Sequence, residues 1–284
     1  MKRFKTLAGA TLLILLFFIT NTYIKASRDT LNNYQKSSQI LSADQILLNK
    51  KKALAYKKHK KELEDKVNLY FNKAIKSGAI VGAGVSIVHG DSIIISDGFG
   101  KRNTTKKSKV NGETVFRLGS LSKGFAGVLA ADLKEEGKLN WDDKITDYIP
   151  DFHFGDEKNT SHIKLSHILS HTSGTAYHSF TNLVEAGLPI ATIAKRFNTV
   201  KPISKPGEVY SYQNAMFSLS QEVIKKTTGN EITTALKNRF FRPLGMTTVS
   251  MNHKAIIKNT NVALPHAKGK KGWRSLPLTN KYYN

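Results

Sequence analysis

The stretch of sequence that decides the fold is residues 115–123, which read VFRLGSLSK. Residues 114–118 have the composition of a short β-strand, and Gly119 interrupts it. From Ser120 onward, apolar residues recur at helical spacing as far as Gly137, so Ser120 is predicted to stand where a helix begins. A hydroxyl at a helix N-terminus lies at the positive end of the backbone dipole, which favours a developing negative charge.

Lys123 gives this serine a partner on the same face of the predicted helix, because it follows three residues later. Burial lowers the pKa of a lysine, and an unprotonated lysine could take the hydroxyl proton of Ser120 and activate it as a nucleophile. Alone, the pattern Ser-x-x-Lys is weak, since residues 161–164 repeat it. No glycine-led strand precedes Ser161, so we interpret that copy as chance.

A second candidate element is Tyr212-Gln213-Asn214, which lies between a turn at residues 206–208 and a predicted helix. A tyrosine beside a lysine ammonium ionises more easily and could relay protons. The amide of Asn214 could hold a carbonyl or amide of a substrate. The alternative is structural: Asn214 caps the helix and Tyr212 packs against its neighbours.

Hydrophobic periodicity organises the rest of the chain. A helix with apolar residues over positions 63–74 is predicted to end at Gly78, and β-rich runs at 80–88 and 92–99 flank a hairpin turn at 89–91. One helix, a few strands and then mostly helices predict an α+β domain over residues 61–284. The later helices are expected at 164–170, 188–198, 214–228 and 231–241.

Composition excludes several classes of protein. Of 284 residues, 40% are hydrophobic and 23% are charged, which suffices for a sizeable core. The absence of cysteine excludes a disulfide scaffold, a thiolate zinc site, an iron–sulfur cluster, a cysteine nucleophile and a lipoprotein anchor. The net charge of +23 is compatible with nucleic acid, an anionic membrane or an anionic wall polymer as a partner.

The N-terminus favours export. A basic segment with Lys2, Arg3 and Lys5 precedes an apolar run over residues 7–20, the order of a secretory signal. Residues 1–26 are therefore predicted to be a signal peptide, cleaved after Ala26, or an N-terminal membrane anchor. This places the protein in the periplasm or cell envelope, held at the inner membrane if the segment is an anchor, and argues against nucleic acid as a partner.

Residues 27–60 are interpreted as a basic linker. Seven lysines lie within positions 50–61, which suits a solvated helical spacer. The alternative is a basic collar that binds an anionic membrane surface.

Four motifs occur in one order along the chain, and together they are specific. They resemble the class C β-lactamase and DD-peptidase-like serine hydrolases over roughly residues 61–284. The motifs are VFRLGSLSK at 115–123, HILSHTSG at 167–174, PG at 206–207 followed by YQN at 212–214, and PLGM at 243–246.

The resemblance implies a β-lactamase/transpeptidase-like fold, an antiparallel sheet flanked by helices plus a helical subdomain. It implies that Ser120 is the acylated nucleophile and that its N–H is one half of the oxyanion hole. Lys123 and Tyr212 would share general acid and base work, and Asn214 would contact the substrate amide. It implies no metal or organic cofactor. A β-lactam, a D-alanyl peptide derived from peptidoglycan, or an ester would be the substrate, and Tyr-Gln-Asn in place of Tyr-Ser-Asn slightly disfavours a dedicated β-lactamase.

One departure from the family pattern affects these expectations. The third motif, Lys-Thr-Gly or His-x-Gly on a later strand, supplies the second oxyanion donor and a cation in the family. Here residues 226–229, KTTG, are one residue too long and have the pattern of a helix C-terminus. Residues 270–272, KKG, lie in a basic stretch without a strand pattern. We therefore expect a C-terminally truncated form of the fold.

Other interpretations fit less well. His167 and His171 are four apart, but HILSH lacks the glutamate of a zinc protease motif. No Gly-x-Ser-x-Gly exists for an α/β-hydrolase, and nothing points to a chymotrypsin-like triad although the pattern does not exclude one. The main alternative is a non-catalytic truncated homologue that binds cell-wall peptide or the membrane surface.

Overall fold

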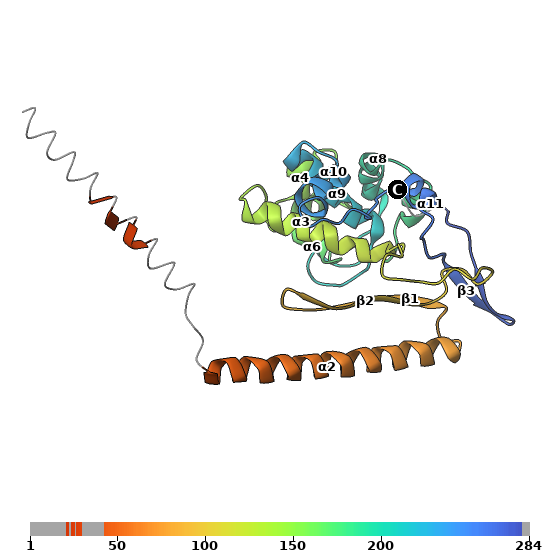
Figure 1. The fold of residues 1–284 in the computed structure, drawn as a ribbon. Helices are drawn as coiled ribbons and strands as arrows, with labels where there is room; N and C mark the ends of the chain where they lie inside the picture. Colours follow the sequence, from red (N-terminus) through yellow and green to blue (C-terminus); the bar gives the residue numbers. More distant parts are fainter. Residues whose placement is uncertain (1–20, 23, 26, 30–42, 280–284) are drawn as a thin grey trace, which may run out of the picture. The chain divides into compact units, whose positions relative to one another are not determined.

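A computed structural model describes residues 21–22, 24–25, 27–29 and 43–279 (Figure 1). They fall into two compact units that divide between Val67 and Asn68, and each unit is described by itself. Most of the predicted signal segment lies outside the described residues. Among the helices that the structure does describe, none combines the length and the apolar character needed to cross a membrane.

The first element is α2, a helix of 34 residues over Ala43–Lys76. It is longer than the helix expected at 63–74 and continues back through the basic segment. Three of its lysines pair with an acid four residues on: Lys61 with Asp65 at 2.8 Å, and Lys58 and Lys60 with Glu62 and Glu64 at 3.9 and 4.0 Å. Exposed pairs of this kind contribute little to the stability of a helix, because water and salt screen the charges. The helix ends just before Gly78, whose φ of +70° glycine adopts readily.

Two strands, β1 (Gly82–His89) and β2 (Ser92–Gly100), form an antiparallel hairpin, as the two β-rich runs and the turn between them predict. The register runs from Gly82 opposite Gly100 to His89 opposite Ser92, with a bulge between Ile87 and Val88. Phe99 of β2 is buried, and its ring stacks on that of Phe71 at a centroid distance of 4.9 Å. The hairpin is thereby held to the last turns of α2.

The strand predicted at 114–118 is wrong. Val115 forms one isolated parallel bridge, with Val262, and makes backbone hydrogen bonds to the flanking residues Asn261 and Ala263. Gly119, with a φ of +55°, then turns the chain into a helix before a ladder can form. The segment is extended and leads directly to Ser120, but it does not add a strand to the sheet.

The expectation of a patternless loop around residues 270–272 is also wrong. Lys270 and Lys271 are the turn of a second hairpin, formed by β3 (His266–Gly269) and β4 (Gly272–Ser275), and Gly272 is the first residue of β4. Strands of four residues are too short for alternation to be recognised in the sequence. The indole N–H of Trp273 donates to the carbonyl of Gly78 at 2.9 Å, which fixes the hairpin beside the start of β1.

The remaining elements are mostly helical. The four later helices are found where periodicity predicts them, although the last divides into an α-helix and a π-turn. In chain order the elements are η1 (Gly119–Ser122), α3 (Lys123–Glu135), α4 (Ile145–Tyr148), α5 (Glu157–His162), α6 (Leu165–Leu169), α7 (Thr181–Glu185), α8 (Ile190–Arg196), η2 (Phe197–Thr199), α9 (Asn214–Thr228), α10 (Ile232–Leu236), η3 (Lys237–Phe241) and α11 (His253–Lys258).

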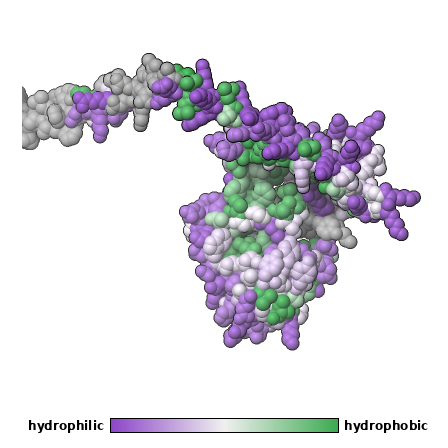
Figure 2. Space-filling view, turned by 90° about the horizontal axis from the view of Figure 1, so that it is seen from below, coloured by the Kyte–Doolittle hydropathy of each residue, from purple (hydrophilic) through white to green (hydrophobic). Residues whose placement is uncertain are grey.

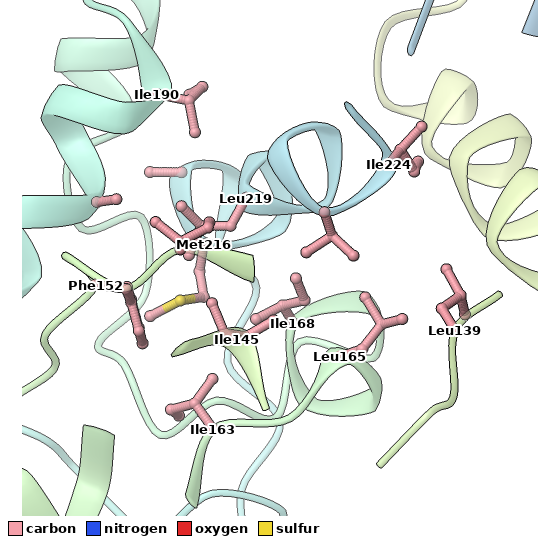
Figure 3. Packing of buried hydrophobic residues seen from close by; sticks show 14 of the residues in the cluster. Leu139, Ile145, Phe152, Ile163, Leu165, Ile168, Ile190, Met216, Leu219 and Ile224 are labelled. Carbon is pink, nitrogen blue, oxygen red and sulfur yellow. The ribbon is translucent and has the colours of Figure 1, made fainter. Parts of the chain in front are cut away.

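Helix α9 is the centre of the hydrophobic core. Met216, Leu219 and Ile224 project from it into a cluster with Ile168 of α6 and Ile145 of α4 (Figure 3). Full burial of a side chain of this size stabilises the fold by about 1.5–3 kcal/mol. Because α9 starts at Asn214, this packing also fixes the position of the residues that precede the helix.

The surface of the globular unit carries both hydrophilic and apolar side chains. Figure 2 shows hydrophilic side chains along much of its margin and apolar side chains gathered toward the middle of the face in view. Two large apolar side chains beside Ser120 are exposed, Leu118 by 47% and Leu121 by 75%. Tyr177 and Tyr210 are exposed by 69% and 66%.

Candidate active site

Ser120 lies in η1, one turn ahead of α3. Gly119 makes the turn from the extended segment, and the hydroxyl of Ser122 donates to its carbonyl at 2.7 Å. Ser120 is exposed, whereas Lys123, the first residue of α3, is half-buried. The predicted site of Ser120 at the start of a helix is therefore correct, with a 3-10 turn as the first turn.

The structure brings the four predicted site residues together. The Nζ of Lys123 donates to the Oγ of Ser120 at 3.2 Å and to the Oδ1 of Asn214 at 2.8 Å. The Oη of Tyr212 donates to the same Oγ at 2.7 Å. The serine oxygen thus accepts hydrogen bonds from two side chains that can each exchange a proton, a geometry suited to general acid–base catalysis.

Electrostatics favour ionisation of Tyr212. Burial opposes it, but the interactions with Lys123 and Ser120 and the positive charge of Lys123 outweigh burial and lower the pKa of Tyr212 below its ordinary value. The Nζ of Lys123 lies 5.2 Å from the centroid of the Tyr212 ring and 5.4 Å from that of Phe217. An ammonium near the face of an aromatic ring is itself stabilised.

The second Ser-x-x-Lys is arranged differently from the first. Ser161 lies in α5, and its hydroxyl donates to the carbonyl of Lys158 at 3.1 Å. Lys164 caps α6, and its ammonium pairs with Asp142 at 2.8 Å. These two side chains are engaged with other partners, in agreement with their interpretation as a chance match.

Two residues beside the site were not predicted to take part in it. Gln213 is fully buried; its Oε1 caps α9 by accepting from the N–H of Ala215 at 3.0 Å, and its Nε2 donates to the carbonyl of Ala176 at 3.3 Å. His171, 9% exposed, contacts the ring of Tyr212. A polar residue directly before a helix was a signal for the cap. Nothing in the sequence indicates the contact of His171.

The two segments weighed as a third motif have other roles. Residues 226–229 end α9, where the hydroxyls of Thr227 and Thr228 bond to the carbonyls one turn back and Gly229 adopts a φ of +70°. This confirms the predicted helix C-terminus. Lys270 and Lys271 form the turn of the β3–β4 hairpin, and Gly272 begins β4.

Sequence comparison decides the family. The profile of the beta-lactamase family matches residues 67–284. The chain belongs to the beta-lactamase family. The four motifs that carry the resemblance all lie within the matched part, and the family's β-lactamase/transpeptidase-like fold is present as helices with small antiparallel sheets.

Relatives of this beta-lactamase family member include the protein flp of Staphylococcus aureus (strain MRSA252), 25% identical over 223 residues that cover 77% of this chain and 43% of flp. An octameric penicillin-binding protein homologue from Pyrococcus abyssi superposes with a TM-score of 0.67 at 24% identity, covering 78% of this chain and 51% of that one. EstCE1, a hydrolase with promiscuous acyltransferase activity, superposes with a TM-score of 0.68 at 22% identity, covering 77% and 60%. The chain therefore spans about half the length of flp and of these two solved structures, one of which is a hydrolase.

Proposed function

We propose that this beta-lactamase family member is an exported serine hydrolase that works by acyl transfer through Ser120. The observation that carries the proposal is the pair of hydrogen bonds from Tyr212 and Lys123 to one serine oxygen, at 2.7 and 3.2 Å. A nucleophile within hydrogen-bond reach of its base is the signature of covalent catalysis.

In the proposed reaction the Oγ of Ser120 attacks a carbonyl carbon. Its proton passes to whichever neighbour is unprotonated, the phenolate of Tyr212 or the amine of Lys123. The carbonyl oxygen becomes an oxyanion that the N–H of Ser120 in the first turn of η1 stabilises. The bond to the leaving group then breaks, and the leaving group takes up the proton. Water attacks the acyl-serine in the reverse sense, which releases the acid and restores the hydroxyl.

Asn214 has two tasks in this proposal. Its Oδ1 accepts from Lys123, which orients the ammonium toward Ser120. Its amide nitrogen is a donor suited to the carbonyl of a substrate amide or ester. No metal or organic cofactor takes part in this chemistry.

The substrate is a β-lactam, a D-alanyl peptide or an ester. The exposed apolar side chains beside the nucleophile, Leu118 and Leu121, favour an apolar acyl group. The N-terminal export pattern and the net charge of +23 favour a substrate at the cell envelope, where the wall polymer and lipid surface are anionic.

The test is the intact mass of the full chain after incubation with a fluorophosphonate and, separately, with a penicillin. The proposal expects one adduct, lost in Ser120→Ala and kept in Ser161→Ala, the matched control from the second Ser-x-x-Lys. A penicillin adduct would indicate wall-peptide or β-lactam chemistry. A folded chain without any adduct would overturn the proposal in favour of a non-catalytic homologue that binds wall peptide or the membrane surface.

A further inference from the structure

We propose that His171 is the positioning residue of Tyr212, a neutral imidazole that holds residues 211–213 and so sets the phenol against Ser120. The inference deepens the proposed function and rests on it for its catalytic meaning. Its structural content, the control of Tyr212 by His171, can be measured without turnover.

The first observation is a pair of backbone contacts on either side of Tyr212. The carbonyl of His171 accepts from the N–H of Ser211 at 2.8 Å. The Nδ1 of the same residue accepts from the N–H of Gln213 at 3.2 Å. One residue therefore anchors the chain both before and after the tyrosine, across 42 positions of sequence.

The second observation is the contact between the rings. The imidazole of His171 lies 4.3 Å from the ring of Tyr212 with an interplanar angle of 38°, and 5.4 Å from the ring of Phe217 on α9. His171 is only 9% exposed, so its ring has little space to move. With the imidazole packed against it and its flanking peptides bound, the phenol keeps the direction that brings its Oη to 2.7 Å from Ser120.

The third observation is the backbone conformation of His171. Its φ is +59°, a left-handed value that non-glycine residues adopt uncommonly and that asparagine tolerates better than most. A residue held in this conformation is a candidate for a functional constraint. Here the conformation lets both the carbonyl and the ring of one residue face the segment with Tyr212.

The imidazole must be neutral to do this, because a protonated Nδ1 cannot accept from the N–H of Gln213. Burial and then the positive charge of Lys123 lower the pKa of His171. The charged and titratable groups that face it are Lys123 from α3 and the phenols of Tyr210 and Tyr212, while α9 contributes the uncharged Phe217. None of the described groups that shift its pKa is a carboxylate. Protonation of His171 would break the hydrogen bond from the N–H of Gln213 to Nδ1. It would also place the positive charge of the imidazolium near the ammonium of Lys123.

Two substitutions separate the acceptor from the ring. His171→Asn keeps an acceptor oxygen near the position of Nδ1 and tolerates the left-handed backbone, but it has no ring and does not titrate. His171→Phe keeps a ring and loses the acceptor. The matched control is His167→Asn, since the Nδ1 of His167 also accepts a backbone N–H, that of Lys164 at 3.2 Å, and burial also lowers its pKa.

Two readouts are measured on the full chain. One is the rate of fluorophosphonate labelling at Ser120. The other is the pKa of Tyr212, from the ultraviolet absorbance difference between each variant and the same variant carrying Tyr212→Phe. We expect His171→Phe to slow labelling by about tenfold to a hundredfold, the effect of a misplaced catalytic group. It should also raise the pKa of Tyr212 toward the ordinary value of about 10. His171→Asn should retain most of the rate, and His167→Asn should change neither readout.

A folded His171→Phe chain with an unchanged pKa of Tyr212 overturns the proposal, whether or not the wild type labels. If labelling is absent from the wild type while His171→Phe moves that pKa, the proposed function fails and the positioning role stands. If His171→Phe does not fold, the pH dependence decides. Besides the dependence on Tyr212, labelling in the wild type should show a further fall as the pH drops through the lowered pKa of His171, below about 6.5, and His171→Asn should lack this further fall. The same acid dependence in both chains overturns the role of the neutral imidazole.

Discussion

The Oη of Tyr212 lies 2.7 Å from the Oγ of Ser120, although 92 positions of sequence separate them. The contact joins the turn before α3 to the turn before α9. Helix α9 is packed in the core, and Gln213 caps its first turn. The backbone that carries Tyr212 is therefore held in place next to Ser120. In the proposed mechanism, proton transfer at Ser120 therefore depends on how accurately the fold places one side chain.

Removal of the phenol hydroxyl tests this dependence. Tyr212→Phe retains the ring that packs against His171 but leaves Ser120 without its nearest proton partner. We expect labelling of Ser120 by a fluorophosphonate to slow by about a hundredfold or more, as for the loss of a general acid–base group. Intact mass over time gives the rate, and circular dichroism controls for folding. An undiminished rate would remove Tyr212 from the mechanism.

The pH dependence of labelling follows from the direction of the Tyr212 shift. Since the neighbours of Tyr212 lower its pKa, its phenolate, one of the two proposed acceptors of the serine proton, is populated at a lower pH than for a free tyrosine. The labelling rate should rise with pH and level off below about pH 10, the ordinary pKa of tyrosine. Tyr212→Phe should lack the rise. A rate that falls over this range, or an identical rise in both chains, would contradict the assignment of Tyr212 as base.

Much of the fold and the site could be predicted from the sequence. Helix α9 follows from hydrophobic period, because it presents a regular buried face. The hairpin β1–β2 follows from two β-rich runs on either side of a turn at residues 89–91. Ser120, Lys123, Tyr212 and Asn214 were predicted from motif context and the family resemblance, and the structure brings them together.

The remainder depends on contacts that local sequence does not encode. The segment around Val115 has the composition of a strand, but its pairing is limited to one isolated bridge, between Val115 and Val262. The short β3–β4 hairpin is fixed by the bond from Trp273 to Gly78, which lies 195 positions away. The link between His171 and Gln213 likewise spans 42 positions. Such tertiary contacts override local propensity.

The core around α9 offers a test of stability separate from chemistry. Leu219 is fully buried in the cluster, so Leu219→Ala removes packed methyl groups and leaves a cavity. We expect the free energy of unfolding to fall by about 2–5 kcal/mol. The control is Leu244→Ala, because Leu244 is 68% exposed and its loss should change stability by only about 0.5 kcal/mol. Equal urea midpoints for the two variants would show that α9 is not the centre of the core.

Two glycines in similarly open surroundings isolate the effect of backbone conformation on the site. A Cβ at Gly119 or at Gly124 would meet no atom within 4 Å, but Gly119 has a φ of +55° while Gly124 lies within α3 without a positive φ. Gly119→Ala should therefore cost about 1–2 kcal/mol for left-handed backbone. Gly124→Ala should stabilise the chain by about 0.4–1 kcal/mol through the unfolded state.

The same pair of variants connects the turn to Ser120. Because Gly119 directs the chain into η1, relaxation of its strained backbone in Gly119→Ala should shift Ser120 away from Tyr212 and slow labelling, whereas Gly124→Ala should label at the wild-type rate. Urea unfolding and the labelling rate, measured on the same samples, check both expectations. Stability changes of the same sign in both variants, or normal labelling in Gly119→Ala, would show that the left-handed turn does not position the nucleophile.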